Sequence, residues 1–431
     1  MRKVFLYILI CVASIGAMAQ PELAQQQLAA NHNRSASNHY AYPSEQLPQL
    51  TPAPEGYMPF FINHYGRHGS RWLTKQSSYD NPVEALKTLQ KEGALTKQGE
   101  VLLDDLRKVA LEAKGRVGDL SDIGAEQHQG IAQRMCDNFP EVFDGDAVID
   151  ARSTVVLRCI LSMGNETQAF KSYNPEIKIL TDASYHDMYY MGWGYGEDTL
   201  ANPQRKAIRH ISDSIFNARI NASRFMSQLV NDTSVIAGRF KSAKFMEAVF
   251  DIAGSLQNHH AFDGMSLFQY FTDEEIYELW KVKNIYWYLQ WANSPQGGNR
   301  MPFIERALLT NMIETADDAI AQGKRGATLR FGHETCVLPL ACLLEIDNVN
   351  YSCDDLNTLH ETWRNYEIFP MGCNIQMVFY RNDNDDILVK VLFNEHEATL
   401  PFHTDTFPYY RWNDIKPYYQ QKLKTTVNWP K

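Results

Sequence analysis

An apolar run that ends abruptly in a loop of arginine and histidine constrains the fold of this chain more than any other feature. Residues 60–65 are mostly apolar, and Arg67-His68-Gly69-Ser70-Arg71 follows almost at once. This order is typical of a buried strand that opens into a loop. Two guanidinium groups flank one imidazole, and guanidinium forks match phosphate or carboxylate oxygens. We therefore expect an oxyanion site at the carboxyl end of a strand, where open α/β sheets bind ligands.

Two later segments repeat the order of strand, polar residues and helix. A short apolar strand at residues 146–149 precedes Ala151-Arg152-Ser153-Thr154, and the strand at residues 327–331 precedes Gly332-His333-Glu334-Thr335. Loops of this kind gather at one edge of an α/β sheet. The sequence therefore predicts a single site that combines one nucleophile, three guanidinium groups, a second imidazole and one carboxyl group.

This set of groups matches phosphoryl transfer through a covalent intermediate. Charge develops on the equatorial phosphoryl oxygens during the reaction, so donors must be fixed around them. A neutral imidazole can attack phosphorus and split the hydrolysis into two easier steps. A carboxyl group can protonate the departing alkoxide in mildly acidic surroundings.

The three segments resemble the signature of the histidine acid phosphatase family, within branch 2 of the histidine phosphatase superfamily. The resemblance is to the group that holds phytases and multiple inositol polyphosphate phosphatases. It covers nearly all of residues 50–410, and the pieces occur in the family's order, with a helical insertion between the second and the third. It implies an α/β fold with an open, mostly parallel sheet flanked by helices, a phosphoglycerate mutase-like core, and a mostly helical cap insertion.

The resemblance also implies a role for each residue. His68 is the nucleophile that becomes the phosphohistidine, and Glu334 is the proton donor that then activates water. The residues expected to hold the phosphoryl oxygens are Arg67, Arg71, Arg152 and His333. Lys75, close behind the signature, is a candidate for contacts with additional phosphates, and Arg158 is expected to be structural. No metal or cofactor is required.

The chain departs from the family pattern at two positions. Leu73 stands where the family commonly has proline. The acid phosphatases usually have His-Asp where this chain has His333 and Glu334, and the inositol polyphosphate phosphatases have His-Ala-Glu, with their glutamate at the position of Thr335. The longer Glu334 side chain can still donate a proton, but its altered reach could change the rate substantially.

The remaining sequence predicts how the chain is divided. Residues 1–19 have a basic start, an apolar stretch too short for the ~20 residues of a membrane span, and an Ala-x-Ala end, which is typical of a secretory signal peptide. Residues 20–55 are polar and predict an irregular lead-in that is partly draped over the fold. We expect the phosphatase core at residues 20–165 and 325–431, and the helical cap insertion at residues 166–324.

Composition limits the partners. Hydrophobic residues make up 44% of the chain, which supports a sizeable core, and the net charge of −10 argues against nucleic acid as a partner. We expect an exported, periplasmic or extracellular phosphomonoesterase that acts on phytate or other inositol phosphates and leaves the membrane once the signal is removed. The alternatives are a general acid phosphatase on sugar phosphates or nucleotides, and a non-catalytic protein that binds phosphorylated ligands. The oligomeric state stays open.

Overall fold

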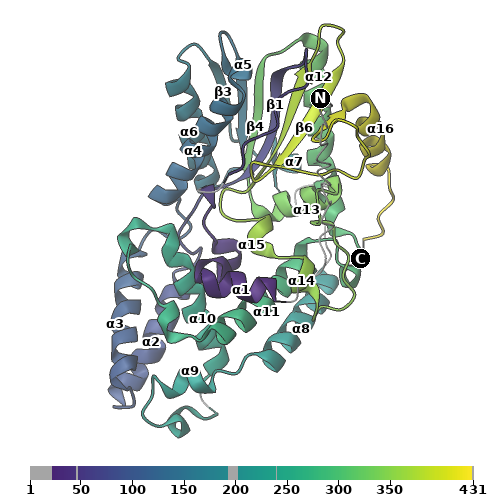
Figure 1. Cartoon of the computed structure of the whole chain (residues 1–431). Helices are drawn as coiled ribbons and strands as arrows, with labels where there is room; N and C mark the ends of the chain where they lie inside the picture. The colour runs from purple at the N-terminus through teal and green to yellow at the C-terminus, as the bar shows by residue number, and fades with distance from the viewer. Residues whose placement is uncertain (1–21, 45–46, 193–201, 239, 430–431) are drawn as a thin grey trace, which may run out of the picture.

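The computed structural model describes residues 22–44, 47–192, 202–238 and 240–429 of the 431-residue chain. A sheet covered by helices on both faces forms the upper half of the molecule in Figure 1, and a layer of helices forms the lower half. The α/β class predicted from the sequence is confirmed. Residues 1–19, the predicted signal peptide, lie outside the described residues. Among the described residues, no helix is both long enough and apolar enough to span a membrane.

The sheet has a parallel half and an antiparallel half. Within the described residues its strands run in the order β3-β2-β4-β1-β5-β6-β7, and β8 pairs with β6. The first four strands in this order are parallel to one another, and β5, β6, β7 and β8 add antiparallel pairs. The strands are β1 Met58–Arg67, β2 Val148–Ser153, β3 Lys178–Asp182, β4 Gly326–Gly332, β5 Asn374–Arg381, β6 Ile387–Phe393, β7 His396–Glu397 and β8 Tyr409–Arg411.

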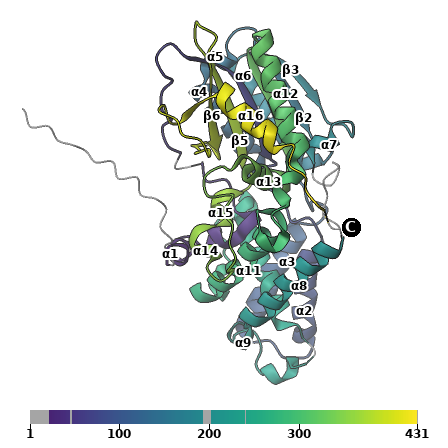
Figure 2. The ribbon, with the colours of Figure 1, turned by 90° about the vertical axis from the view of Figure 1, so that its right-hand side faces the viewer.

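Both faces of the sheet are covered, so its central strands are apolar almost throughout. On β1, Phe61 and Tyr65 pack toward one cluster of helices and Ile62 packs toward the other. Figure 2 shows the helices of the first cluster in front of the sheet. They are α12 Arg306–Gln322, α13 Glu334–Leu344 and α16 Trp412–Lys422, and those of the second cluster are α4 Asp122–Asn138, α5 Pro140–Phe143 and α6 Leu157–Tyr173.

The helical layer below the sheet has its own core. Trp72, Leu86 and Leu106 pack against Phe225, Phe250 and Leu279 in one buried cluster. The helices here and at the junction with the sheet are α2 Ser77–Lys91, α3 Lys97–Glu112, α7 Met188–Met191, α8 Asn202–Arg219, α9 Ser223–Ser227, α10 Ser242–Ser255, α11 Asp273–Trp291, α14 Leu359–Thr362 and α15 Asn365–Ile368.

The helices pack in a way that differs from the predicted division of the chain. Helices α2 and α3 fall within the range predicted as core, yet they pack with α9 and α10 in the helical layer. Helix α12 falls within the range predicted as cap, yet it packs on the sheet, where the amide of Asn63 donates to the carbonyl oxygen of Met312 at 2.6 Å. The sequence shows that each helix has an apolar face, but not which neighbour covers that face.

The segment predicted to be an irregular lead-in packs over the fold, as expected, but part of it is helical. It forms α1 Leu23–Ala30 and the 3₁₀ segment His32–His39, which lie at the junction between the sheet and the helical layer (Figure 1). Leu28 of α1 packs in a small buried cluster with Tyr277 and Trp280 of α11. The lead-in is therefore part of the fold and reaches the edge of the sheet where ligands are expected.

Candidate active site

The site forms where neighbouring strands end. Arg67, the last residue of β1, pairs in register with Gly332 at the end of β4, and the end of β2 pairs with the preceding residues of β4. The backbone amide of His68 donates to the carbonyl oxygen of Gly332 at 3.0 Å. The loops that begin at His68 and His333 therefore start side by side, as the sequence predicts.

Close contact between two backbones fixes the loop that follows β1. A Cβ atom on Gly69 would lie 2.3 Å from the carbonyl oxygen of Gly124 in α4, so only glycine fits there. The amide of Ser70 donates to Gln127 at 2.8 Å, and its hydroxyl donates to Asn258 at 2.6 Å. A loop held in this way keeps its groups in place when charge develops beside it.

Hydrogen bonding determines which nitrogen of His68 is free. Nδ1 lies 2.9 Å from the carbonyl oxygen of Gly69, and because a carbonyl can only accept, Nδ1 carries the proton. Nε2 therefore keeps its lone pair. Burial, followed by the charges of Arg158 and Arg67, holds the pKa of His68 well below its usual range. The ring is a neutral imidazole with one nucleophilic nitrogen.

Arg67 is fully buried and ties several parts of the site together. Nη1 donates to the carbonyl oxygen of Phe369 at 3.0 Å, and Nη2 donates to the carbonyl oxygen of Asn38 at 2.7 Å. Its Nε atom lies 3.0 Å from Oε2 of Glu334. Arg67 thus holds Glu334 in place, and a polar atom of Glu334 lies within 4.8 Å of a ring nitrogen of His68.

Arg71 and Arg158 each contribute a guanidinium group that has a donor without a hydrogen-bond partner among the described residues. Nη1 of Arg71 donates to the carbonyl oxygen of Trp72 at 3.0 Å. The Nε atoms of Arg71 and Arg158 are buried and have no hydrogen-bond partner in the described part of the chain. Both charges lower the pKa of His68 and that of His333, where burial is the larger cause. Because buried donors without a partner are costly, these two point to a bound anion.

Arg152, predicted as the third phosphate-binding arginine, lies outside this cluster. Its guanidinium group contacts Asp150 at 2.7 Å, Asp182 at 3.1 Å and Asp187 at 3.2 Å. A fork occupied by three carboxylates is not free to hold a phosphate. The reason is that β2 runs on past the predicted end of the strand, so Arg152 is a strand residue and pairs with Asp182 of β3 in the ladder.

Arg158 lies where Arg152 was expected. It sits in the first turn of α6, directly after the loop that follows β2. The sequence could have indicated Arg158 by its position, because it stands where the helical pattern begins, shortly after the end of a strand. Lys75, the candidate for additional phosphates, is exposed and does not line the cavity described below, although the adjacent Thr74 does.

His333 and Glu334 stand at the start of α13, where a helix N-terminus favours anions. The rings of His68 and His333 are 5.5 Å apart and nearly perpendicular, at 73°. Burial, and then the charge of Arg158, lowers the pKa of His333 to about 4. His333 is therefore neutral near pH 7 and can donate one hydrogen bond.

Glu334 is ionised in this structure. Burial alone would raise its pKa, but the charges of Arg67 and Arg71 outweigh burial and lower the pKa to about 2. The side-chain amide of Asn38 also donates to its Oε1 at 3.2 Å. A phosphate dianion bound to the guanidinium groups would oppose their effect, so we expect Glu334 to take up a proton when substrate binds.

Nitrogens of His68 and His333 and an oxygen of Glu334 lie within 4.8 Å of one another, close enough to hold a metal ion. The surrounding charge is unfavourable for one. Arg67 already pairs with the Glu334 carboxylate, and Arg71 and Arg158 add positive charge. Like charges at this distance repel, so the site suits an anion better than a cation.

A cavity of about 470 Å³ opens from the site into the helical layer. Its lining mixes basic, acidic and aromatic side chains, which suits a polar ligand with hydroxyl groups as well as phosphates. Nζ of Lys283 lies 2.6 Å from Asp251, and Nζ of Lys244 lies 3.1 Å from Glu247. The lining residues are Asn38, His39, Arg71, Thr74, Arg209, Ser212, Asp213, Phe216, Lys244, Glu247, Asp251, Val282, Lys283, Tyr286 and Trp287.

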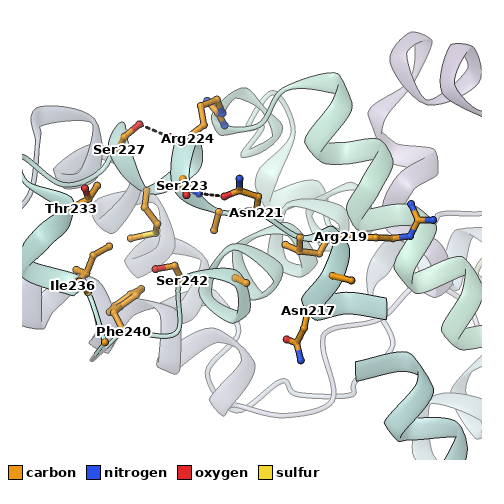
Figure 3. Close-up of a pocket in the computed structure, with 17 residues that line it drawn as sticks. Asn217, Arg219, Asn221, Ser223, Arg224, Ser227, Thr233, Ile236, Phe240 and Ser242 are labelled. Carbon is orange, nitrogen blue, oxygen red and sulfur yellow. Dashed lines mark hydrogen bonds between the residues drawn. The ribbon is translucent and has the colours of Figure 1, made fainter. Parts of the chain in front are cut away.

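A larger cavity, of about 850 Å³, lies away from this site. Figure 3 shows its lining residues on the end of α8, on α9 and at the start of α10. The charged side chains described in its lining are Arg219 and Arg224, and they pair with Glu278 and Glu275. Volume alone therefore does not identify the functional site; the buried Nε atoms of Arg71 and Arg158, without a hydrogen-bond partner among the described residues, favour the site beside His68.

Fold and site together define an α/β protein with a buried histidine and several guanidinium groups at the edge of its sheet, an arrangement suited to binding a phosphate group. Comparison with protein families agrees with this class. The family model of the histidine phosphatase superfamily (branch 2) matches residues 66–394, so the chain belongs to that superfamily, as its sequence motifs predict.

Solved structures with the same fold include a multiple inositol polyphosphate phosphatase from Bifidobacterium longum in complex with phosphate. Its TM-score is 0.72 at 18% identity, over 91% of this chain and 98% of that one. The complex of the Bifidobacterium longum enzyme with inositol hexasulfate gives 0.71 at 18% identity, over 89% and 97%. The phytase from D. castellii gives 0.69 at 16% identity, over 95% and 92%. Sequence comparison with curated proteins gives no significant match.

Proposed function

We propose that this protein hydrolyses phosphate monoesters through a phosphohistidine intermediate on His68. The observation that carries the proposal is the state of the His68 ring, with Nδ1 bonded to Gly69 and Nε2 free. The unpartnered Nε donors of Arg71 and Arg158 support it, since they would meet phosphoryl oxygens. His333 would donate a further hydrogen bond to the same group.

In the first step, the lone pair on Nε2 of His68 attacks phosphorus and the bond from phosphorus to the ester oxygen breaks. The departing oxygen takes the proton of Glu334, so the alcohol leaves neutral and Glu334 becomes a carboxylate. The guanidinium groups of Arg71 and Arg158 stabilise the charge on the equatorial oxygens. Arg67, whose two Nη atoms donate to backbone carbonyls and whose Nε lies 3.0 Å from the Glu334 carboxylate, positions Glu334 and adds positive charge.

In the second step, the Glu334 carboxylate takes a proton from water. The water oxygen forms a bond to phosphorus, and the bond from phosphorus to Nε2 of His68 breaks. Inorganic phosphate leaves, His68 returns to its neutral form and Glu334 is protonated again, which completes the cycle. The same carboxyl group therefore serves as acid and then as base.

The substrate that we propose is an inositol phosphate. Support comes from the fold shared with a multiple inositol polyphosphate phosphatase and a phytase. The cavity beside Arg71 is also lined by a further basic group, Arg209, that could meet another phosphate. Its acidic groups, Asp213 and Asp251 among them, favour a second candidate class, sugar phosphates and partly phosphorylated inositols that present free hydroxyls.

Phosphate release from 4-nitrophenyl phosphate, phytate and glucose 6-phosphate, followed between about pH 4 and pH 8, tests both parts. We expect turnover of the aryl ester and faster release from phytate than from the sugar phosphate. Brief reaction with a ³²P-labelled ester and an alkaline quench should trap label on the protein, and H68A should carry none. Folded protein without phosphate release at any of these pH values would exclude catalysis.

A non-catalytic binding role would give a different result. It predicts that phosphate binds wild type and H68A equally well by calorimetry while neither releases phosphate from an ester. For localisation we propose export, on the strength of residues 1–19. Mass spectrometry of the protein secreted by its host should find an N-terminus at Gln20, and an intact Met1 on a cytoplasmic protein would contradict export.

A further inference from the structure

The lead-in crosses the active site as a strap, residues 35–42, that is tied down on both sides. The side-chain amide of Asn365 donates to the hydroxyl of Ser37 at 2.9 Å, and that of Asn258 donates to the carbonyl oxygen of His39 at 2.8 Å. Both asparagines are fully buried. Buried polar groups that bond to a segment fix its path more strictly than apolar contacts do.

The backbone of the strap is strained just before it reaches the catalytic groups. Ser37 has φ 58° and ψ −123°, a backbone conformation that residues other than glycine rarely adopt and that costs about 1–3 kcal/mol. Such strain persists only where the surroundings enforce it. Its result here is that the next residue, Asn38, turns both its polar groups to the site. Its carbonyl oxygen accepts from Arg67, and its side-chain amide donates to Glu334.

We propose that Asn38 is a positioning residue for the proton donor: its amide orients the Glu334 carboxyl group and sets the pH range in which that group is protonated in the substrate complex. The inference rests on the proposed function. It assigns a role to a segment that precedes the catalytic motif and that the sequence predicts to be irregular.

The amide of Asn38 acts on Glu334 together with several charged and titratable neighbours. Burial raises the pKa of Glu334, and the charges of Arg67 and Arg71 lower it more, with help from His333 and the hydrogen bond of Asn38. The groups that face Glu334 from the surrounding elements are Arg67 of β1, His68 and Arg71 of the loop after β1, His333 at the start of α13, His39 of the strap, Cys159 of α6 and Cys373 before β5.

Unlike these groups, Asn38 has no titratable proton, and it donates a hydrogen bond to Glu334 from outside the catalytic motifs. A donor stabilises the ionised carboxylate, so its removal raises the pKa of Glu334. Replacement by aspartate keeps the shape of the side chain but puts a like charge beside the carboxylate, which raises the pKa further. The two variants therefore form a graded series, N38A and then N38D, in one direction.

The test measures kcat against pH for wild type, N38A, N38D and the control N33A, with glycerol 2-phosphate and with 4-nitrophenyl phosphate. Asn33 lies on the same 3₁₀ segment, and its backbone carbonyl, not its side chain, bonds to Gln257. With the alkyl ester, the alkaline limb of kcat should move up by about half a pH unit in N38A and by about one unit or more in N38D. N33A should match wild type.

Because nitrophenolate leaves without a proton, its release depends little on Glu334. We therefore expect kcat at the optimum to fall about tenfold in N38A with the alkyl ester and less than threefold with the aryl ester. An unshifted alkaline limb in both Asn38 variants would overturn the proposal while leaving the phosphatase activity established. Equal losses with both esters, or the same shift in N33A, would also overturn it, since they indicate a general structural effect.

A second measurement does not depend on turnover. Proton uptake on binding of inorganic phosphate, found by calorimetry in two buffers of different ionisation enthalpy, reports protonation of Glu334. The pH of maximal uptake should rise in the order wild type, N38A, N38D. Identical uptake profiles in all three folded proteins would contradict the role of Asn38 even if no ester were hydrolysed.

Discussion

Separate substitutions of Arg158 and Arg152 show which of these two arginines binds the phosphoryl group. R158A removes a guanidinium group whose buried Nε has no hydrogen-bond partner among the described residues and whose charge lowers the pKa of His68 more than any cause except burial. Removal of one fixed donor to a transition-state oxyanion lowers the rate about 10²–10³-fold. We therefore expect kcat/KM to fall by that factor in R158A. R158K keeps the charge but not the fork, so its loss should be smaller, about tenfold.

R152A should behave in the opposite way. The guanidinium group of Arg152 is bound to Asp150, Asp182 and Asp187, and its side chain is 29% exposed. Partly exposed ion pairs contribute about 0.2–1 kcal/mol each, so their loss should cost about 1–2 kcal/mol of unfolding free energy. Because none of these contacts reaches His68, kcat/KM should change less than threefold.

The assay combines kcat/KM on 4-nitrophenyl phosphate near pH 5 with urea unfolding of the same four proteins, wild type included. Activity loss in R158A and stability loss in R152A is the expected pattern. If R152A lost activity a hundredfold and R158A kept it, the arrangement of charges around His68 described above would be wrong, and the prediction from the sequence would stand instead.

Three further results are expected. E334Q should lower kcat on an alkyl phosphate about 10²-fold but on 4-nitrophenyl phosphate less than tenfold, and equal losses would mean that Glu334 is not the acid. Burial raises the pKa of Glu305 to about 8, so the folded chain keeps a proton that the unfolded chain loses near pH 4.5. The free energy of unfolding therefore falls as the pH rises from about 4.5 to about 8. E305Q should therefore be up to about 3 kcal/mol more stable than wild type at pH 7 in urea, and no more stable at pH 4; an equal gain at both would refute this. G69A should lower the free energy of unfolding by about 1–3 kcal/mol and remove most of the activity, because its Cβ would lie 2.3 Å from a carbonyl oxygen. The control G164A, whose Cβ would have nothing within 4 Å, should be neutral or slightly stabilising.

The strand, loop and helix around His68 could be predicted from the sequence because their signals are local. β1 is apolar, it ends in a glycine-rich polar run, and the same pattern recurs at His333. Both strands are buried on both faces, so hydrophobicity marks them clearly. The roles implied for His68 and Glu334 stay proposals, and the geometry of the two groups agrees with them.

The predictions from the sequence differ from the structure where contacts between distant parts of the chain determine the position of a residue. The apolar signal of β2 ends at Ile149, yet pairing with β3 and β4 extends the strand through Arg152. That extension turns Arg152 toward the aspartates and brings Arg158 to the site. Asn38 and its hydrogen-bond partner Glu334 are 296 residues apart in the chain, and nothing in a polar lead-in indicates such a contact.

The strap has a consequence for how the pH optimum of this enzyme can change. The match to the family begins at residue 66, whereas the strap occupies residues 35–42. A part that tunes the working acidity thus lies upstream of the part that defines the chemistry. Selection for a more acidic or a more neutral habitat can act on a short, largely buried peptide while the sheet and its arginines stay unchanged. Substitutions within this peptide therefore offer a direct route to the same reaction with a different pH optimum.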